Sequence, residues 1–144
     1  MLSNDVFDKV YTIVKTAMSD LEIVNSKGES VPKWAGLNFA RSLHELEETA
    51  LPCLLVMQIG SPQVGDDLLR KAQNGVDSTF QVESTSSTSY EEAYDAMGDV
   101  GDILNQLGYS LTYGVQELPT TSPSLWRFVA RFNRVVGGQD VLSI

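Results

Sequence analysis

The apolar positions of residues 6–21 predict an amphipathic helix at the start of the chain. They recur at steps of three and four, which places them on one side of a helix. These positions are Val6, Val10, Ile13, Ala17 and Leu21. Ser3 or Asn4 is a suitable N-cap, and we expect the helix to end near Ser19. The β-branched run LEIVN follows, and then the turn-like NSKGES at 25–30.

The segment 51–59, LPCLLVMQI, is apolar at both alternating sets of positions. This pattern is typical of a strand that is buried on both faces of a sheet. Pro52 must stand at the start of the strand, because proline has no N–H to donate to a ladder. Residues 34–50 before it are irregular and predict at most a short helix.

A second strand is predicted at 76–84, with one solvated face. Val76, Phe80 and Val82 share one side with Ser78 and Ser84, whereas Asp77, Thr79, Gln81 and Glu83 share the other. The pair Asn74-Gly75 is a strong hairpin signal. It would join this strand to a short arm at 67–73, which follows the loop GSPQVGDD.

A second amphipathic helix is predicted from Tyr90 to about Leu107, after the linker TSSTS. Ser89 and Glu92 fit a capping box, in which each side chain accepts a hydrogen bond from an unpaired backbone N–H. Gly108 is a suitable C-cap. The apolar stripe consists of Ala93, Met97, Val100, Leu104 and Leu107. The opposite side carries Glu91, Glu92, Asp95, Asp99 and Asp102.

Two alternating segments at 109–117 and 124–136 predict the closing strands. In the first, Tyr109, Leu111, Tyr113 and Val115 alternate with Ser110, Thr112, Gly114 and Gln116. In the second, Trp126, Phe128, Ala130 and Phe132 point one way, and Arg127, Val129, Arg131 and Asn133 point the other. We therefore expect the aromatic side of the last strand to be buried and its arginine side to be exposed.

The composition narrows the classes of function. The formal net charge is -9 and the pI is about 4.4, which argues against a general nucleic-acid binder, because neutralising phosphates supplies most of that affinity. A single cysteine excludes an internal disulfide and suggests a protein made in a reducing cytoplasm. No apolar run is long enough to span a bilayer, and MLSNDVFDKV lacks the features of a signal peptide. The length favours one domain.

Candidate chemistry is sparse. His44 and Cys53 are the only residues of their types, and one of each cannot form a structural zinc site. A catalytic triad would have to use His44, and no nucleophile elbow is present. The carboxylates of the second helix are interpreted as a solvated face, since a metal site would need them to converge. We expect no catalytic, cofactor-binding or metal-binding residues and no enzymatic activity.

Arg127, Arg131 and Arg134 are three of only ten basic residues in this acidic chain. A strip that binds single-stranded nucleic acid combines cationic and stacking side chains on one surface. Trp126 and Phe128, however, point away from Arg127 and Arg131 on a strand. Two interpretations remain: a solvated outer face, or a protein interface, in which arginine is enriched.

Lengths and charges suggest an interface between subunits. The Cα atoms of Arg127 and Arg131 are about 13 Å apart on a strand. The aspartates of the second helix, Asp95 to Asp102, span about 10 Å along its axis, so the two lengths are compatible. Two glycines in that helix each cost about 1 kcal/mol relative to alanine, which indicates either close packing or contact with a neighbouring subunit. The candidate interface residues are Arg127, Arg131, Arg134, Asp95, Asp99, Asp102, Gly98 and Gly101.

Three stretches, in this order after an N-terminal helix, carry a resemblance to a known family. ALPCLLVMQIG, residues 50–60, is a strand that begins at a Leu-Pro pair. FQVESTSSTSYEEAYDAMGDVGDILNQL, residues 80–107, joins a strand to a Ser/Thr linker and a helix spaced by alanines. LWRFVARF, residues 125–132, is an aromatic-rich final strand. Their order and spacing, over about residues 50–136, resemble the tail terminator (tail completion) proteins of long-tailed bacteriophages.

The resemblance implies a single tail-terminator-like domain over residues 1–144. Its fold would be α/β (α+β), a mixed, mainly antiparallel sheet of four to five strands with the N-terminal helix and the 90–107 helix packed on it. It also implies a virion protein, made in the bacterial host cytoplasm. This protein would form a homo-oligomeric, usually hexameric ring on the head-proximal end of the tail tube.

Such a ring stops tube polymerisation and offers a docking surface to the head. Expected partners are the tube protein, a head-closure or connector protein and, in a contractile tail, the sheath protein; DNA passes through the lumen without specific binding. Two alternatives remain: another neck protein, or a small-molecule-binding α/β module or enzyme domain. A closed ring would favour the terminator, and a monomer with a ligand pocket would favour the module.

Overall fold

The computed structural model describes residues 3–47, 49–59, 63–64, 75–120 and 122–137. Its main sheet has the strand order β3-β4-β6-β8-β7, and β5 pairs with β6 beside this path. The strands are β3 (Asn38–Ala40), β4 (Cys53–Gln58), β5 (Gln63–Val64), β6 (Gly75–Ser86), β7 (Ser110–Leu118) and β8 (Trp126–Gly137). Among the described strand pairs of this sheet, only β3 and β4 are parallel. The expected α+β class with a mixed, mainly antiparallel sheet is confirmed.

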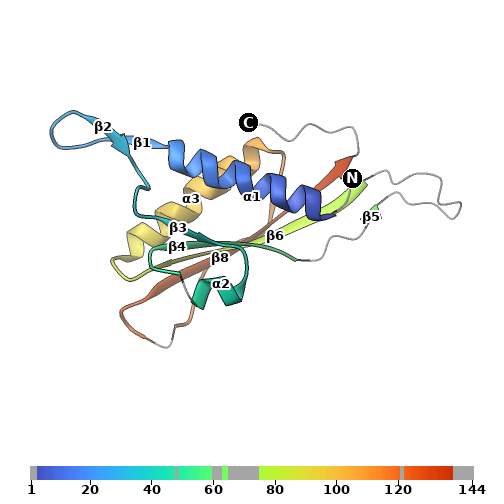
Figure 1. The fold of residues 1–144 in the computed structure, drawn as a ribbon. Coiled ribbons are helices and arrows are strands. Elements are labelled where there is room, and N and C mark those ends of the chain that lie inside the picture. Colours follow the sequence, from blue (N-terminus) through green and yellow to red (C-terminus); the bar gives the residue numbers. More distant parts are fainter. Residues whose placement is uncertain (1–2, 48, 60–62, 65–74, 121, 138–144) are drawn as a thin grey trace, which may run out of the picture.

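Helices cover both faces of the sheet unequally (Figure 1). α1 (Ser3–Asp20) and α3 (Tyr90–Gln106) pack on one face, which we call the inner face, and the short α2 (Leu43–Glu47) lies on the other, the outer face. The main core lies between the two long helices and the inner face; its largest fully buried side chains include Tyr109, Phe80, Met18, Leu54 and Met97. A small second cluster of Ala40, Cys53 and Leu55 lies on the outer face, with Leu46 of α2 packed against it.

The buried side of α1 differs in part from the expected one. Its fully buried line runs at steps of four through Val6, Val10, Val14 and Met18, whereas Ile13, Ala17 and Leu21 are only half-buried. Steps of four drift slowly around a helix of 3.6 residues per turn, so one line stays against the core for several turns. The predicted stripe of α3, by contrast, is buried at every position.

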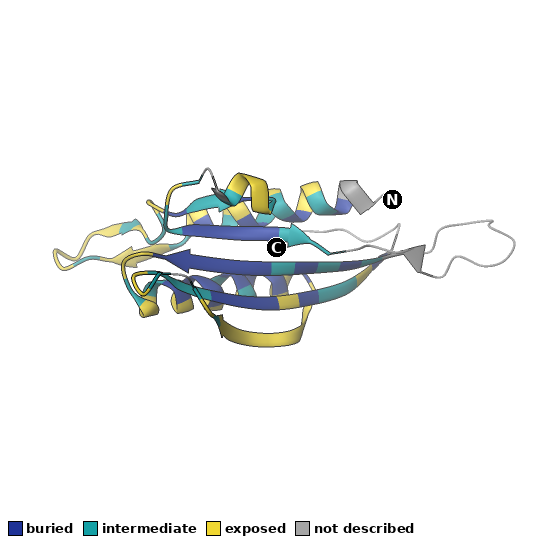
Figure 2. Ribbon diagram, turned by 90° about the horizontal axis from the view of Figure 1, so that it is seen from below, coloured by how far each residue is buried: buried dark blue, intermediate teal, exposed yellow. Residues whose placement is uncertain are grey.

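The second face of β6 is less solvated than its polar residues predict. Asp77, Thr79 and Gln81 are half-buried, and Glu83 is only 6% exposed. The reason is that β6 is a central strand: Glu83 has Leu55 and Val129 as its register partners on β4 and β8. Figure 2 shows this outer face, with buried residues along the middle strands.

The edge strand β7 departs from its alternating pattern. Ser110–Glu117 are all exposed, including Leu111, Tyr113 and Val115. The register between β7 and β8 shifts twice, between Leu111 and Tyr113 and between Tyr113 and Gln116. Such bulges bend a strand and disrupt its ladder. β7 therefore curves away along the edge of the molecule (Figure 2).

The segment before β4 contains more structure than its sequence predicts. β1 (Glu22–Val24) and β2 (Ser30–Pro32) form a two-stranded hairpin around the predicted turn at 25–30, and this hairpin projects from the body (Figure 1). The expected short helix corresponds to α2, but β3 was not predicted. Part of the expected loop after β4 is the strand β5. The predicted arm at 67–73 and Asn74 lie outside the described residues.

Candidate functional site

The start of α3 is fixed by a network of serines. Ser89 is extended at φ -160° and ψ 157°, and its Oγ accepts a hydrogen bond from the N–H of Glu92 at 3.0 Å. The second half of the expected capping box is different: the carboxylate of Glu92 accepts from the hydroxyl of Ser86, and that hydroxyl oxygen accepts from the N–H of Ser89. α3 therefore starts at a fixed point relative to the end of β6.

The end of α3 is held by Arg134. Gly108 has φ +87°, the left-handed conformation that favours glycine after a helix. The Nη1 group of Arg134 donates to the carbonyl oxygen of Leu107 at 2.6 Å, where a cation also complements the helix dipole. Arg134 is an even-numbered residue of β8 and lies on the inner face, unlike Arg127 and Arg131. Within the chain it is a helix-capping residue.

Two of the predicted interface aspartates have partners within the same chain. The Nζ group of Lys33 lies 2.8 Å from Asp99 and 3.1 Å from Asp95. The indole N–H of Trp34 donates to Asp99 at 2.8 Å. Burial alone would lower the pKa of Lys33, but the hydrogen bonds to Asp99 and then Asp95 outweigh it, so the pKa is raised above 10.5. These contacts tie the base of the β1–β2 hairpin to α3.

The outward side of α3 forms an acidic ridge. At 100° per residue, Glu91, Asp95, Gly98 and Asp102 fall within a sector of about 60°, and all four are exposed. Glu91 and Asp102 form no hydrogen bond or ion pair with any described residue. We call these four residues the α3 ridge.

The two glycines of α3 have different surroundings. A Cβ atom at Gly101 would lie 3.6 Å from the ring of Phe132, so the expected close packing is present there. At Gly98 such an atom would meet nothing within 4 Å. No described contact explains a glycine at this helical position, although it costs about 1 kcal/mol relative to alanine.

Arg127 and Arg131 are held in a common arrangement on the outer face. The Nε–H of Arg127 donates to Thr85 at 3.1 Å, and the Nε–H of Arg131 donates to Gln81 at 3.0 Å. The guanidinium of Arg131 also lies over the ring of Tyr113, 5.5 Å from its centroid. Neither arginine uses its two Nη groups for a hydrogen bond to a described residue. One N–H of each planar guanidinium is thus fixed, which also fixes the plane in which its terminal N–H groups lie.

Val129, which is only 4% exposed, separates the two arginines. Gln81, Tyr113, Leu118, Val129 and Arg131 line a shallow hollow of about 310 Å³ beside it. Glu83 is on the same face, but it is buried and accepts from the amide of Gln81 at 2.8 Å. Guanidinium groups are thus the charges that reach solvent in this part of the outer face. We call Arg127, Val129 and Arg131 the arginine strip.

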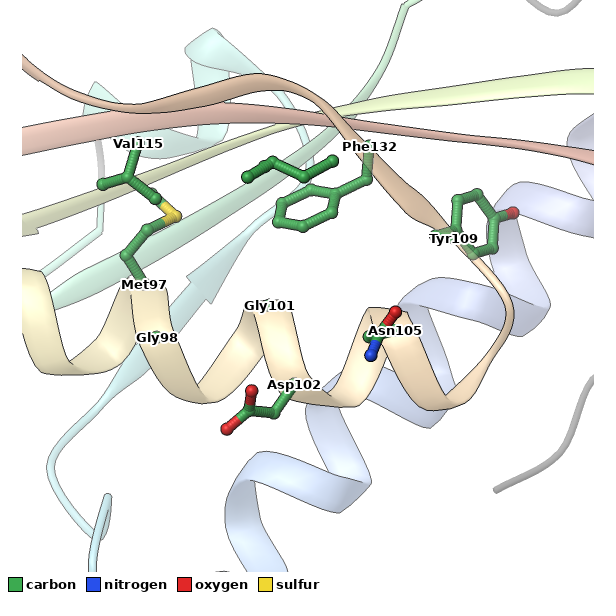
Figure 3. A pocket seen from close by; sticks show the side chains of 9 residues that line it. Met97, Gly98, Gly101, Asp102, Asn105, Tyr109, Val115 and Phe132 are labelled. Atoms are coloured by element: carbon green, nitrogen blue, oxygen red, sulfur yellow. The ribbon is translucent and has the colours of Figure 1, made fainter.

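A second hollow of about 260 Å³ opens on the inner side, between α3 and β7 (Figure 3). Phe132, Met97 and Val115 point into it, and Gly101 leaves room at its centre. Leu111 and Val115 remain 52% and 38% exposed. Asp102 and Asn105 lie on α3 at its border. This hollow is lined mainly by apolar groups.

The remaining candidate groups are Cys53 and His44. Cys53 is fully buried, and burial raises the pKa of its thiol to about 11, so the nucleophilic thiolate is scarce at neutral pH. His44 is an exposed residue of α2. Among the described residues, no group of three or more His, Cys, Asp or Glu side chains could hold a metal ion. In the same part of the chain, no helix is long and apolar enough to cross a membrane.

The structure thus places the predicted charged residues at three separate positions. Arg127 and Arg131 share the outer face, Asp95 and Asp99 meet Lys33, and Arg134 caps α3. Sequence reasoning missed several supporting residues, namely Lys33, Trp34, Thr85, Gln81 and Tyr113. Lys33 and Trp34 are adjacent in the sequence, but their contacts with α3 gave no local signal. Each of these contacts joins segments far apart in the chain.

Comparisons with protein-family models and with curated proteins assign no function to this chain, so a functional assignment has to rest on the fold and the surfaces. No protein-family model matches the sequence. A search of curated proteins likewise finds no match.

Proposed function

We propose that this chain is a tail terminator subunit, which forms a ring on the head-proximal end of a phage tail tube. The ring stops tube polymerisation and gives the head connector its docking surface. The observation that carries the proposal is the order of the elements. A strand begins at the Leu51-Pro52 pair, β6 runs through a serine-rich linker into a capped helix, and the aromatic strand β8 follows.

The distribution of charge also supports a structural subunit. The α3 ridge is acidic and the arginine strip of the outer face is basic, so two patches on opposite sides of one sheet carry opposite charges. A molecule with complementary opposite sides is suited to head-to-tail contacts, which close into a ring when the rotation between subunits allows it. The net charge of -9 suits a lumen through which DNA slides without adhering.

Cross-linking in intact virions tests this assignment. We expect subunit-to-subunit cross-links of this chain, together with cross-links to the tube protein and to a neck protein. Cross-links to a connector without any to the tube would instead indicate a head-closure protein. A chain that is absent from virions, or that forms no contact with a second copy there, would contradict the proposal.

A further inference from the structure

Gly98 and the two arginine forks are features that the isolated subunit does not explain. The Cβ position at Gly98 is open for 4 Å, although its neighbours on the α3 ridge are charged side chains. On the other side of the sheet, both guanidinium groups are oriented through Nε, and their Nη groups form no hydrogen bond with a described residue. Two N–H groups on one edge of a guanidinium match the two oxygens of a carboxylate.

We propose that the α3 ridge of one copy docks across the arginine strip of a second copy. Glu91 and Asp102 would bind the Nη groups of Arg127 and Arg131, and Gly98 would let the helix approach the strand at Val129. This inference rests on the proposed ring and names the two surfaces that join its subunits.

The dimensions of the two surfaces agree. Glu91 and Asp102 are eleven residues apart, or about 16 Å along the helix axis. The Cα atoms of Arg127 and Arg131 are about 13 Å apart on β8. The remaining difference is smaller than the length of an arginine side chain, so both carboxylates lie within reach of a fork at the same time. Gly98 falls between the two carboxylates, as Val129 falls between the two arginines.

The charges make a second copy the fitting occupant. Of the four described arginines, Arg41 forms an ion pair with Asp8 and Arg134 binds Leu107, whereas Arg127 and Arg131 keep terminal Nη groups with no hydrogen-bond partner among the described residues. On the α3 ridge, the carboxylates of Glu91 and Asp102 lack a partner among the described residues, whereas Asp95 pairs with Lys33. Because the ridge and the strip lie on opposite sides of the sheet, each copy can use both at once. The contact is therefore heterologous and propagates in one direction.

Charge reversal in two separate variants tests this interface. The first variant carries Arg127→Glu with Arg131→Glu, and the second carries Glu91→Lys with Asp102→Lys. Each alone places like charges in every contact, so we expect self-association at least about tenfold weaker than that of the wild type. In an equimolar mixture, the glutamates in the strip of the first variant meet the lysines in the ridge of the second. The native strip of the second variant meets the native ridge of the first, so opposite charges face each other in both contacts. Sedimentation of the mixture should therefore return to the wild-type pattern.

A substitution without charge tests the close approach. Gly98→Gln introduces a side chain into space that is empty in the subunit, so the thermal stability should be unchanged or higher while self-association is lost. Gly36→Gln is the matched control, because a Cβ atom at Gly36 also meets nothing within 4 Å. We expect the control to associate like the wild type.

The outcomes separate this interface from the capping function. Normal association of either reversal variant, or no recovery in their mixture, would overturn the interface and leave the capping function to the virion experiment. A wild-type protein that stays monomeric up to about 1 mM, the weak end of ordinary affinities, would also overturn it. Equal loss of association in Gly98→Gln and Gly36→Gln would remove Gly98 from the interface.

Discussion

The Nη1 group of Arg134 donates to the carbonyl oxygen of Leu107 at 2.6 Å, which joins the last strand to the end of α3. The last carbonyls of a helix have no partners within the helix, and a cation there stabilises it by about 0.3–1 kcal/mol, or up to about 2 kcal/mol in partly buried geometry. Arg134, a residue of the predicted interface group, thus has a role within the subunit.

We expect Arg134→Ala to lower the free energy of unfolding by about 1–2 kcal/mol, because the carbonyl of Leu107 and the helix dipole lose their cation. Urea denaturation followed by circular dichroism measures this. Arg134→Lys keeps the charge and should recover part of the loss. An unchanged midpoint in Arg134→Ala would show that this contact does not stabilise the subunit.

Asp99 and Asp95 should differ in their contribution to stability, although both bind Lys33. Asp99 also accepts from Trp34 and its side chain is 19% exposed, whereas that of Asp95 is 54% exposed. Asp99→Ala leaves the partly buried indole N–H of Trp34 without its acceptor and leaves Lys33 with Asp95 alone, so we expect a loss of about 1–3 kcal/mol. Asp95→Ala should cost no more than about 1 kcal/mol. Equal losses in urea denaturation would contradict the central place of Asp99 in this contact.

The stability should fall at alkaline pH because of Tyr109. Burial raises the pKa of its phenol above 10.0, and the hydrogen bond to Ser78 and the charge of Arg134 only partly oppose this. A raised pKa in the folded state contributes stability that is complete below pH 10 and is lost as the pH rises through the folded-state pKa.

Unfolding measured from pH 8 to 11.5 tests this dependence. The double variant Tyr109→Phe with Ser78→Ala removes the ionisable group and its 2.8 Å hydrogen-bond partner together. Its free energy of unfolding should decline less steeply above pH 10 than that of the wild type. Parallel curves would show that another group causes the alkaline loss.

We expect no measurable binding to free duplex DNA at physiological salt. The net charge of -9 opposes contact with phosphates, and the arginines on the outer face are few and separated by Val129. A gel-shift titration at micromolar protein is sufficient. A salt-sensitive shift would overturn this prediction and the proposed passive lumen.

The elements with strong local signals could be predicted from the sequence. Helix α3 combines a period of 3.6 residues with the cap at Ser89 and the stop at Gly108, and the aromatic side of β8 alternates over many residues. These features depend on neighbours in the chain. The strand β3 could not be found, because Asn38–Ala40 is too short to show a period.

The contacts at the candidate site were harder to predict for a different reason. Trp34 and Asp99 are 65 residues apart, and a helical wheel places Asp99 on a polar side without showing what approaches it. The exposure of Leu111 and Val115 follows from bulges in β7, which depend on its pairing with β8. Charge patterns located the arginines and the acidic side of the helix. Only the three-dimensional arrangement shows which of them lack partners among the described residues.

The double change Arg127→Ala with Arg131→Ala should leave the subunit folded, because the buried aromatic side of β8 is untouched. The loss of the hydrogen bonds to Thr85 and Gln81 should cost about 1 kcal/mol each. In a phage that carries this variant, we expect weakened ring assembly, with tails of uncontrolled length or tails that fail to join heads. Normal tails joined to heads would reduce the two arginines to a solvated face of the sheet.

The length distribution of tails assembled without this chain tests the capping function most directly. Electron micrographs of lysates from a phage with the gene deleted should show tubes of variable, excessive length that lack heads, and supplying the wild-type chain should restore a single length. Tails of uniform length that join heads in the absence of the chain would contradict the proposal that it terminates the tube.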